Sequence, residues 1–333
     1  MRRRVRVLVV KPSRASFVEQ DSEILQKHFD VRTIDLLNSG RSLGRRLKVF
    51  LRLLRGVVWA DVTFSWFADV YALWAVRLSR ILLKKSIVIV GGYETARIEE
   101  LGYGLLTAAK GEKMVRKILS KADLVLAVSE FVRREASDLS PNSRVSVIPL
   151  GIDPDKLPPP TEKENMVLTV GPATEDSGIL KGIDVFVEAS RGLPNLRFVV
   201  VGSFDESVRT RLGAISPSVE FTGRLQYDEL MACMNRAKVY CQLSVRESFG
   251  VAVAEAMALG CVPVVSDSGK LPALVGGTGF VVPPKDVAAA VAAIRKAASP
   301  GAGIKAKERA RTEFTIARRE LALVDKINEL VKA

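Results

Sequence analysis

The stretch RESFGVAVAEAMALGCVPVVSD, residues 246–267, contains one complete step of an α/β fold. The apolar run before it, residues 239–245, is typical of a buried β-strand, and residues 246–250 read as its exit loop. Residues 251–259 are strong helix formers, and Gly260 stands where a helix commonly ends. A second apolar run, residues 261–267, predicts the next strand. Strand, loop, helix and strand in this order predict a parallel sheet with helices on its faces.

The same alternation extends through the whole chain and predicts two doubly wound α/β domains. A proline-rich charged stretch, DPDKLPPPTEKEN at residues 153–165, reads as the linker between them. Ligands of such folds bind beyond the carboxyl ends of the strands, so we look for functional residues there. The predicted strands are residues 5–12, 30–36, 60–67, 86–92, 123–130 and 144–151 before the linker, and 165–171, 196–203, 218–223, 239–245, 261–267 and 279–284 after it.

Composition excludes several classes of protein. The 333 residues are 48% hydrophobic and 26% charged, which is typical of globular domains. The three cysteines, at 233, 241 and 261, have no paired spacing, which argues against a zinc site or a disulfide framework. No uncharged run approaches the ~20 apolar residues that span a bilayer, and the apolar run near the N-terminus is too short for a signal-peptide core. We therefore expect a cytoplasmic protein.

Positive charge is concentrated in the first half of the chain. Residues 1–150 carry 27 lysines and arginines against 15 aspartates and glutamates, a net charge of +12 out of a total of +13. The segment at residues 41–59 alternates a basic stripe with an apolar stripe about 200° away on a helix. The apolar stripe consists of Leu43, Leu47, Phe50, Leu54 and Val57. The pattern fits a surface helix packed on the core, or a helix lying on an anionic membrane at the inner face of the cell membrane. The membrane-docking candidates are Arg41, Arg45, Lys48, Arg52 and Arg55.

A weaker cationic stripe, Lys110, Lys113, Lys117 and Lys121, also favours the membrane interpretation. Nucleic acid would attract the same charge. However, only 6% of the residues are aromatic and no base-stacking motif is present, which argues against a nucleic-acid partner.

Two glutamates mark the segment 246–267 as a candidate ligand site. Glu247 lies in the predicted loop and Glu255 about two turns later in the helix. The backbone N–H groups of Phe249, Gly250 and Val251 would form a helix N-terminus suited to phosphate oxygens. Carboxylates accept hydrogen bonds from sugar hydroxyls, so this spacing predicts a diphosphate held between two hydroxyl-bearing groups. The alternative is a solvated loop charge at Glu247 and an exposed helix residue at Glu255.

The segment ESFGVAVAEAMALGCVPVVSD resembles the Glu-x7-Glu motif of the retaining glycosyltransferases of family 4, also called group 1. Further motifs in the same order are VSE at 128–130, VIPLGID at 147–153, LKGIDVFVEA at 180–189, VEFTGRL at 219–225 and GTGFVVPPKD at 277–286. The resemblance implies an α/β fold of GT-B architecture, with two Rossmann-like domains facing a cleft. It implies an acceptor domain at residues 1–152, a nucleotide-sugar domain at 165–303 and a helical segment at 304–333 that crosses back to the first domain.

The resemblance also implies roles for individual residues. Glu255 would bind the ribose of a nucleotide, and Glu247 the transferred sugar. Lys181 matches the family's lysine that neutralises the departing diphosphate, which makes Lys181 and Glu247 the catalytic candidates. The donor-binding candidates are Lys181, Arg224, Glu247, Ser248, Phe249, Gly250, Val251 and Glu255. The implied donor is a UDP- or GDP-sugar, transferred with retention of configuration and with no metal or other cofactor.

The chain departs from the family pattern on the acceptor side. Gly91 stands where relatives often have a histidine. Acidic residues stand before Lys181 where many relatives have an arginine. KPSRAS, residues 11–16, replaces the glycine-rich loop that commonly follows the first strand. Two hypotheses follow: an enzyme that acts on a lipid-linked or glycan acceptor at a membrane, and a non-catalytic module that binds a nucleotide sugar or a partner. The acceptor-side candidates are Trp66, Gly91, Gly92, Tyr93 and Glu94.

Overall fold

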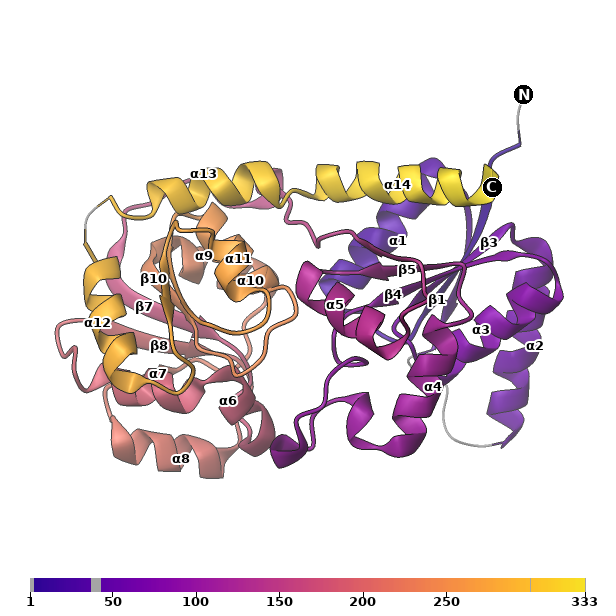
Figure 1. Ribbon diagram of the computed structural model, residues 1–333. Helices are drawn as coiled ribbons and strands as arrows, with labels where there is room; N and C mark the ends of the chain where they lie inside the picture. Colours follow the sequence, from indigo (N-terminus) through magenta and orange to yellow (C-terminus); the bar gives the residue numbers. More distant parts are fainter. Residues whose placement is uncertain (1–2, 37–42, 300, 333) are drawn as a thin grey trace. The chain divides into compact units, whose positions relative to one another are not determined.

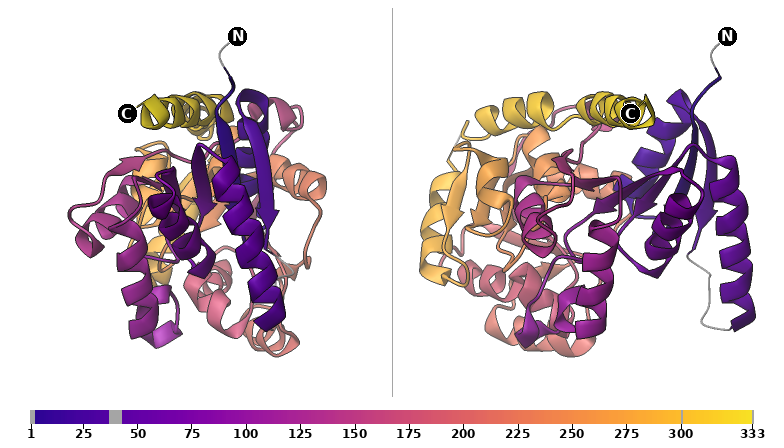
Figure 2. Two further views of the ribbon diagram at one scale, coloured as in Figure 1. Left: turned by 90° about the vertical axis from the view of Figure 1, so that its right-hand side faces the viewer. Right: turned by 45° about the vertical axis from the view of Figure 1, so that its right-hand side comes forward.

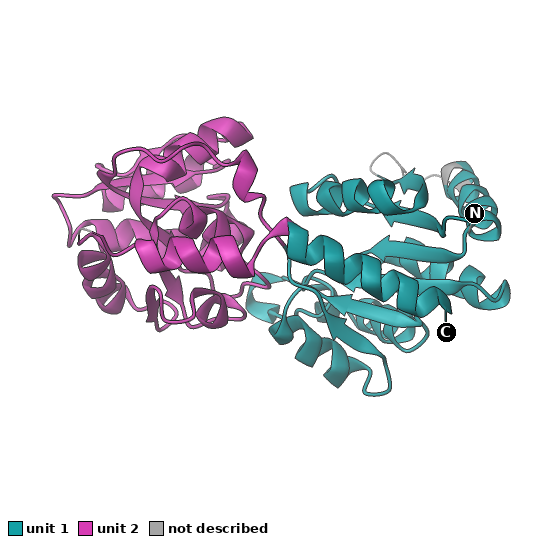
Figure 3. Ribbon diagram, turned by 90° about the horizontal axis from the view of Figure 1, so that it is seen from above, with its two compact units in different colours: residues 1–150, 317–333 teal, residues 151–316 magenta. Residues whose placement is uncertain are grey.

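The computed structural model describes residues 3–36, 43–299 and 301–332. The chain divides into two compact units (Figure 3). The first consists of residues 1–150 and 317–333, and the second of residues 151–316. The segment 304–333 is therefore shared, because its first helix belongs to the second unit and its last helix to the first.

The first unit is a parallel six-stranded sheet in the order β2-β1-β3-β4-β5-β6 (Figure 1). Its described strands are β1 Arg6–Lys11, β2 Asp30–Asp35, β3 Val62–Trp66, β4 Lys85–Val90, β5 Leu124–Ala127 and β6 Val145–Val147. Its described helices are α1 Ser16–His28, α2 Leu43–Trp59, α3 Val70–Ile81, α4 Ala109–Leu119, α5 Glu130–Leu139 and α14 Ile316–Lys332, with short 3₁₀ helices at Glu99–Leu101 and Leu105–Thr107.

The second unit is also a parallel six-stranded sheet, in the order β12-β11-β10-β7-β8-β9. Its described strands are β7 Glu164–Val170, β8 Arg197–Val201, β9 Glu220–Phe221, β10 Ala237–Gln242, β11 Val262–Ser266 and β12 Phe280–Val282. Its described helices are α6 Glu175–Lys181, α7 Ile183–Ser190, α8 Glu206–Ile215, α9 Tyr227–Arg236, α10 Val251–Ala258, α11 Leu271–Val275, α12 Val287–Ala297 and α13 Ile304–Glu313, with a 3₁₀ helix at Pro154–Lys156.

These strands confirm the prediction of two doubly wound sheets, since each predicted apolar run overlaps one described strand. The runs are continuous rather than alternating because helices cover both faces of each sheet. In β1, for example, residues Val7 to Val10 are all at most 1% exposed. The predicted strand at 218–223 contributes only the two residues of β9 at the edge of its sheet.

The strand order places a switch point in each sheet. In the second unit, β8 and β9 lie on one side of β7, whereas β10, β11 and β12 lie on the other. The connections that leave the carboxyl ends of β7 and β10 therefore diverge and leave a crevice between them, where ligands of doubly wound folds bind. The residues that follow β7 and β10 are thus the first place to look for a site.

The final helix, α14, is fastened to the first unit by a buried ion pair. The guanidinium of Arg319 donates from Nε to Oδ1 of Asp21 at 2.6 Å and from Nη2 to Oδ2 at 2.7 Å. Its Nη1 donates to the carbonyl oxygens of Ile148 and Pro149 at 2.8 and 2.9 Å. Both charged side chains are at most 2% exposed. Figure 2 shows α14 and α1 side by side, as this contact requires.

Candidate functional site

The structure brings Lys181 and Glu247 together at the switch point of the second unit. Lys181 is the last residue of α6, which follows β7, and Glu247 lies in the loop after β10. The Lys181 Nζ atom donates to Oε2 of Glu247 at 2.8 Å. The side chains are 28% and 16% exposed, so the pair is partly open to solvent. The cation and the carboxylate that the sequence identifies as catalytic candidates are thus neighbours.

The backbone around this pair is fixed by close contacts that glycine permits. Gly182 has φ of +67°, and a Cβ there would lie 2.1 Å from the carbonyl oxygen of Leu243. The N–H of Val245 donates to the carbonyl of Leu180 at 2.9 Å, which ties the exit of β10 to the end of α6. On the other side, a Cβ on Gly269 would lie 2.0 Å from the Glu247 carbonyl oxygen. These contacts hold the loop that carries Glu247 between two neighbouring turns.

The amino end of α10 begins at a glycine in the left-handed region. Gly250 has φ of +94°, and a Cβ would lie 3.0 Å from a methyl carbon of Leu274. No side chain caps this helix end, so the first N–H groups of α10 keep their hydrogen-bonding capacity for a ligand. The side chain of Phe249 is 2% exposed and packs edge-on against Phe314, with ring centroids 6.0 Å apart. Phe249 therefore offers only its main chain, whereas the half-buried Ser248 donates its N–H to Oε1 of Glu247 at 3.2 Å.

Glu255 lies one helical turn inside α10 and is half-buried. Burial raises the pKa of its carboxyl to about 7, and a hydrogen bond from the Tyr227 hydroxyl opposes this shift. That bond is 3.3 Å long and is the only one that Glu255 makes with its side chain among the described residues. A carboxylate without a cation beside it retains acceptor capacity for hydroxyl groups of a ligand.

Tyr227 is a site residue that sequence reasoning missed. It opens α9, is 45% exposed and places its hydroxyl on Glu255. Burial and the Glu255 charge both raise the pKa of Tyr227, so the phenol acts as a donor at neutral pH. The signal available in the sequence was an aromatic residue directly after the FTGRLQ loop, at the carboxyl end of a strand.

A buried polar row runs from β10 into its exit loop. The hydroxyl of Tyr240 donates to Oε1 of Gln242 at 3.0 Å, and Nε2 of Gln242 donates to Oγ of Ser244 at 2.6 Å. Alternate residues of a strand share a face, which explains the spacing of two. Burial raises the pKa of Tyr240, and the charges of Glu247 and Glu255 raise it further. Both carboxylates therefore lie near the same buried phenol.

Arg224 lies in the loop between β9 and α9 and is exposed. It makes no hydrogen bond or ion pair with another described residue. Its predicted role at the nucleotide stays a prediction.

In the first unit, Glu94 is a buried structural acceptor. It is 1% exposed, and its carboxylate accepts hydrogen bonds from the N–H groups of Gly91, Gly92 and Ala68 at 3.2, 2.9 and 3.4 Å. Burial raises the pKa of the Glu94 carboxyl, although these hydrogen bonds act in the opposite direction. The carboxylate thus joins the loops that follow β3 and β4, and little of its surface is left for contact with a ligand.

The other acceptor-side candidates differ in exposure. Trp66, at the end of β3, is 1% exposed and packs against Phe17 and Phe67 in the core. Tyr93 is 45% exposed and stands edge-on to Tyr103, with ring centroids 5.1 Å apart. Of the two aromatic candidates, Trp66 and Tyr93, only Tyr93 has an exposed side chain.

The basic segment forms α2, and its packing is different from the predicted two-stripe pattern. The core contacts come from Val49, Leu53 and Val57, which are at most 6% exposed, with Phe50 and Leu54 partly buried beside them. Leu47, predicted on the apolar stripe, is 59% exposed. Leu51 and Val58 are also exposed, at 44% and 56%. α2 is therefore packed on the core and also presents a second apolar row to solvent.

The basic residues of α2 flank this outer row. Lys48, Arg52 and Arg55 are exposed, and none forms an ion pair with another described residue. Arg41 lies outside the described residues, as does the side chain of Arg45. No helix in the described part of the chain is both long and apolar enough to cross a bilayer. The same residues contain no group of three or more histidine, cysteine, aspartate or glutamate side chains arranged around a metal position.

Two doubly wound units, each with a parallel sheet, define the GT-B class of folds. Two family models match the chain in succession: "Glycosyltransferase Family 4" matches residues 1–156, and "Glycosyl transferases group 1" matches residues 155–313. The chain belongs to the group 1 glycosyltransferases of family 4.

Curated relatives are similar over part of their length. A phosphatidyl-myo-inositol mannosyltransferase of Mycobacterium leprae is 30% identical over 178 residues, which are 49% of this chain and 46% of the relative. A GDP-mannose-dependent monoacylated alpha-(1-6)-phosphatidylinositol monomannoside mannosyltransferase of Corynebacterium glutamicum is 25% identical over 56% of this chain and 55% of the relative. The chain thus spans about half the length of the curated relatives that it matches.

Solved structures confirm the fold over the full chain. The sucrose-phosphate synthase of Thermosynechococcus elongatus has a TM-score of 0.74 at 19% identity, covering 98% of this chain and 99% of the other. HepE of Anabaena, solved with UDP and glucose, has a TM-score of 0.75 at 16% identity, covering 98% and 100%.

Proposed function

We propose that this protein transfers a sugar from a nucleotide diphosphate sugar to an acceptor hydroxyl, with retention of the anomeric configuration. The observation that carries the proposal is the pairing of Lys181 with Glu247 at the β7/β10 switch point, beside the uncapped amino end of α10. A cation, free N–H groups and two carboxylates are what a diphosphate between a ribose and a sugar requires. The donor would be a UDP- or GDP-sugar, as in the relative named for GDP-mannose and the neighbour solved with UDP.

In this proposal each group has a separate task. The N–H groups at Phe249, Gly250 and Val251 hold phosphate oxygens, and Glu255 accepts hydrogen bonds from the ribose. Glu247 binds hydroxyls of the sugar. Its bond to Lys181 opens when the donor enters, and the ammonium then turns to the diphosphate.

The chemical step breaks the bond between the anomeric carbon and the phosphate oxygen, so negative charge grows on the diphosphate. Lys181 stabilises that charge, and such help counts most where charge develops in the transition state. The acceptor oxygen bonds to the anomeric carbon on the same face, and its proton goes to the departing phosphate. No protein nucleophile is needed, and Glu247 and Glu255 act as binding groups rather than as an acid and base pair. We expect no metal or other cofactor, because Lys181 supplies the positive charge.

We further propose that the acceptor is a membrane-associated lipid or a lipid-linked glycan, reached from the inner face of the cell membrane by a cytoplasmic protein. Two observations support this. The two curated relatives described above are named for phosphatidylinositol substrates. The exposed apolar row Leu47, Leu51 and Val58 on α2 lies beside Lys48, Arg52 and Arg55, a combination that binds anionic bilayers.

The activity is tested by incubating the purified protein with UDP- and GDP-sugars and a lipid extract, and measuring transferred label. Lys181→Ala is expected to lower kcat by about 10²–10³-fold, the range found when one preorganised charge-stabilising group is removed. Lys296→Ala, an exposed lysine on α12, is the matched control and should leave the rate unchanged. Transfer that survives both Lys181→Ala and Glu247→Ala would reject the site.

The second hypothesis, a non-catalytic module, rests on Gly91 and on the acidic residues before Lys181. It would be favoured by tight nucleotide-sugar binding without transfer or hydrolysis of any donor tested.

Membrane binding is tested by sedimentation with liposomes. We expect binding to vesicles that contain an anionic lipid, and we expect it to fall with rising salt and with Arg52→Glu plus Arg55→Glu. Leu47→Ser plus Leu51→Ser should weaken binding even at low salt, because it removes the apolar contribution. Equal binding to neutral vesicles would overturn the electrostatic part of the proposal.

A further inference from the structure

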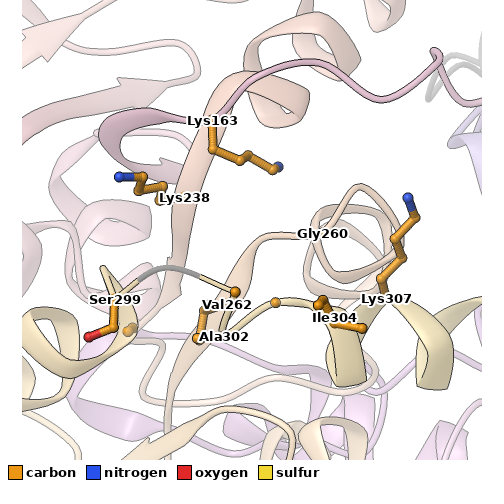
Figure 4. A pocket seen from close by; sticks show the side chains of 11 residues that line it. Lys163, Lys238, Gly260, Val262, Ser299, Ala302, Ile304 and Lys307 are labelled. Carbon is orange, nitrogen blue, oxygen red and sulfur yellow. The ribbon is translucent and has the colours of Figure 1, made fainter.

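The second unit has a lysine-lined pocket at the edge of its sheet opposite the candidate site (Figure 4). Lys163 directly precedes β7, Lys238 is the second residue of β10, and Val262 is the first residue of β11. All three therefore lie at the amino ends of parallel strands, whereas Lys181 and Glu247 follow the carboxyl ends. The pocket has a volume of about 200 Å³, far above the ~10–15 Å³ that one water molecule requires.

Among the described residues, no acidic side chain lines this pocket. Lys163, Lys238 and Lys307 contribute three ammonium groups, and none of them is within ion-pair distance of a carboxylate among the described residues. The Nζ atom of Lys163 donates to the carbonyl of Leu259 at 2.8 Å, and that of Lys238 to Oδ1 of Asn165 at 2.6 Å. Each ammonium has three donors, so both keep unused hydrogen-bonding capacity.

Lys163 and Lys307 form the charged part of the pocket. In Figure 4 the side chains of Lys163 and Lys307 flank Gly260, whereas the ammonium of Lys238 points away from both. An ideal Cβ on Gly260, which lies between them, would be within 3.9 Å of both lysine side chains. Burial lowers the pKa of Lys163, and the nearby Lys307 charge lowers it further, whereas Cys261 opposes the shift. Two like charges that repel each other at a partly buried place are stabilised by an anion between them.

The rest of the pocket is apolar and backbone. Val262, Ala297, Ala302 and Ile304 supply hydrocarbon, and α13 begins at Gly303 without a side-chain cap. A Cβ on Gly303 would lie 2.1 Å from the carbonyl oxygen of Gly260, so the chain needs glycine to bring the start of α13 against the end of α10. The pocket thus offers cations for an anionic group and an apolar wall for a few carbon atoms.

We propose that this pocket is a second anion site, which binds the phosphate group of a small phosphorylated molecule between Lys163 and Lys307. A phosphate monoester fits better than a carboxylate, because it carries up to two negative charges and three strong acceptor oxygens. The site is separate from the donor site and does not depend on the proposed glycosyl transfer.

Calorimetric titration with glycerol 3-phosphate tests the proposal, with glycerol as the uncharged control and with ionic strength held constant. The wild-type protein should bind glycerol 3-phosphate saturably and should not bind glycerol. Lys307→Gln should weaken binding by about 10- to 150-fold, because a charge-assisted hydrogen bond contributes about 1.5–3 kcal/mol and 1.4 kcal/mol is ten-fold. Lys163→Gln plus Lys307→Gln should abolish saturable binding. Inorganic phosphate, titrated in parallel, shows whether the carbon skeleton contributes.

Two controls separate this site from others. Lys296→Gln, whose lysine lies next to Ala297 but does not line the pocket, should leave affinity within about two-fold, the scatter expected of a surface substitution. Lys181→Ala should also leave it unchanged. Absence of saturable binding to the wild-type protein, or binding that the double variant retains and Lys181→Ala loses, would overturn the proposal. Lys163→Gln removes the hydrogen bond to Leu259 and could therefore disturb the end of α10. Lys307 has no hydrogen-bond partner among the described residues, so Lys307→Gln tests the site without that disturbance.

Discussion

Replacing Arg319 by Met is expected to destabilise the first unit strongly. The substitution leaves the carboxylate of Asp21, which is completely buried, without its two hydrogen bonds of 2.6 and 2.7 Å. It also removes the donor to the carbonyls of Ile148 and Pro149. Breaking a buried pair by removing one partner costs about 3–5 kcal/mol, because a charge remains buried without compensation. We expect a loss of this size in the free energy of unfolding.

The chain provides its own probe for this measurement. All three tryptophans, Trp59, Trp66 and Trp74, belong to the first unit, and the Arg319 guanidinium lies 5.8 Å from the ring centroid of Trp66. Tryptophan fluorescence during urea titration therefore reports on that unit. With a denaturant slope of ~2 kcal/mol per M, the midpoint should fall by about 1.5–2.5 M.

Two further variants make the test specific. Asp21→Leu combined with Arg319→Met replaces the pair by apolar side chains and should recover much of the loss, as buried pairs often tolerate such exchange. Lys27→Ala removes an exposed partner of Glu320 beside the same helix and should change stability by less than ~1 kcal/mol. A midpoint for Arg319→Met within ~0.3 M of the wild type would refute the reasoning, because the pair would then contribute no more than a surface contact.

Three other predictions concern the second unit. Because burial raises the pKa of Glu255 to about 7, its carboxyl is mostly ionised above pH 7 and mostly protonated below it, so affinity for UDP or GDP should fall as the pH is lowered from 8 to 6. Calorimetry should show that Glu255→Gln removes this pH dependence relative to wild type. An equal dependence in both proteins would contradict the assignment. Gly250→Ala places a side chain at a residue with φ of +94° and against Leu274, so it should lower the free energy of unfolding by about 1–3 kcal/mol and weaken nucleotide binding. Thermal shift with and without nucleotide measures both effects, and unchanged binding would show that the start of α10 does not contact the nucleotide. Transfer activity should persist in excess EDTA, because Lys181 supplies the positive charge that a metal ion provides in other sites. Activity that EDTA abolishes and that Mg²⁺ or Mn²⁺ restores would contradict this expectation.

The sheets could be predicted from sequence because burial on both faces leaves a continuous apolar run, as in VLVV before Lys11 and VPVV after Cys261. The positions of Lys181 and Glu247 followed from the family motifs, and strand order then explains why they meet. Helix orientation was harder to predict. In α2, apolar residues occupy more than one face, so the pattern alone could not tell the buried Val49 and Leu53 from the exposed Leu47 and Leu51.

Other features depended on contacts that no local pattern encodes. Asp21 and Arg319 are 298 residues apart in sequence, and neither stands out in its own helix. The sequence placed Glu94 at a strand exit, but not the inward turn by which the N–H groups of Gly91 and Gly92 enclose its carboxylate. Tyr227 was missed because its hydrogen bond to Glu255 joins two different helices, α9 and α10, and no local sequence pattern predicts such a contact.

The division of the first unit between two distant segments has a consequence for synthesis. Residues 1–150 leave the ribosome long before α14, yet Asp21 has its cation only when Arg319 has been made. The second unit is continuous, so it can fold to completion while the earlier one still lacks a helix. Domains usually mature in the order of translation. In this chain we expect the reverse order, with residues 1–150 waiting until α14 has been made.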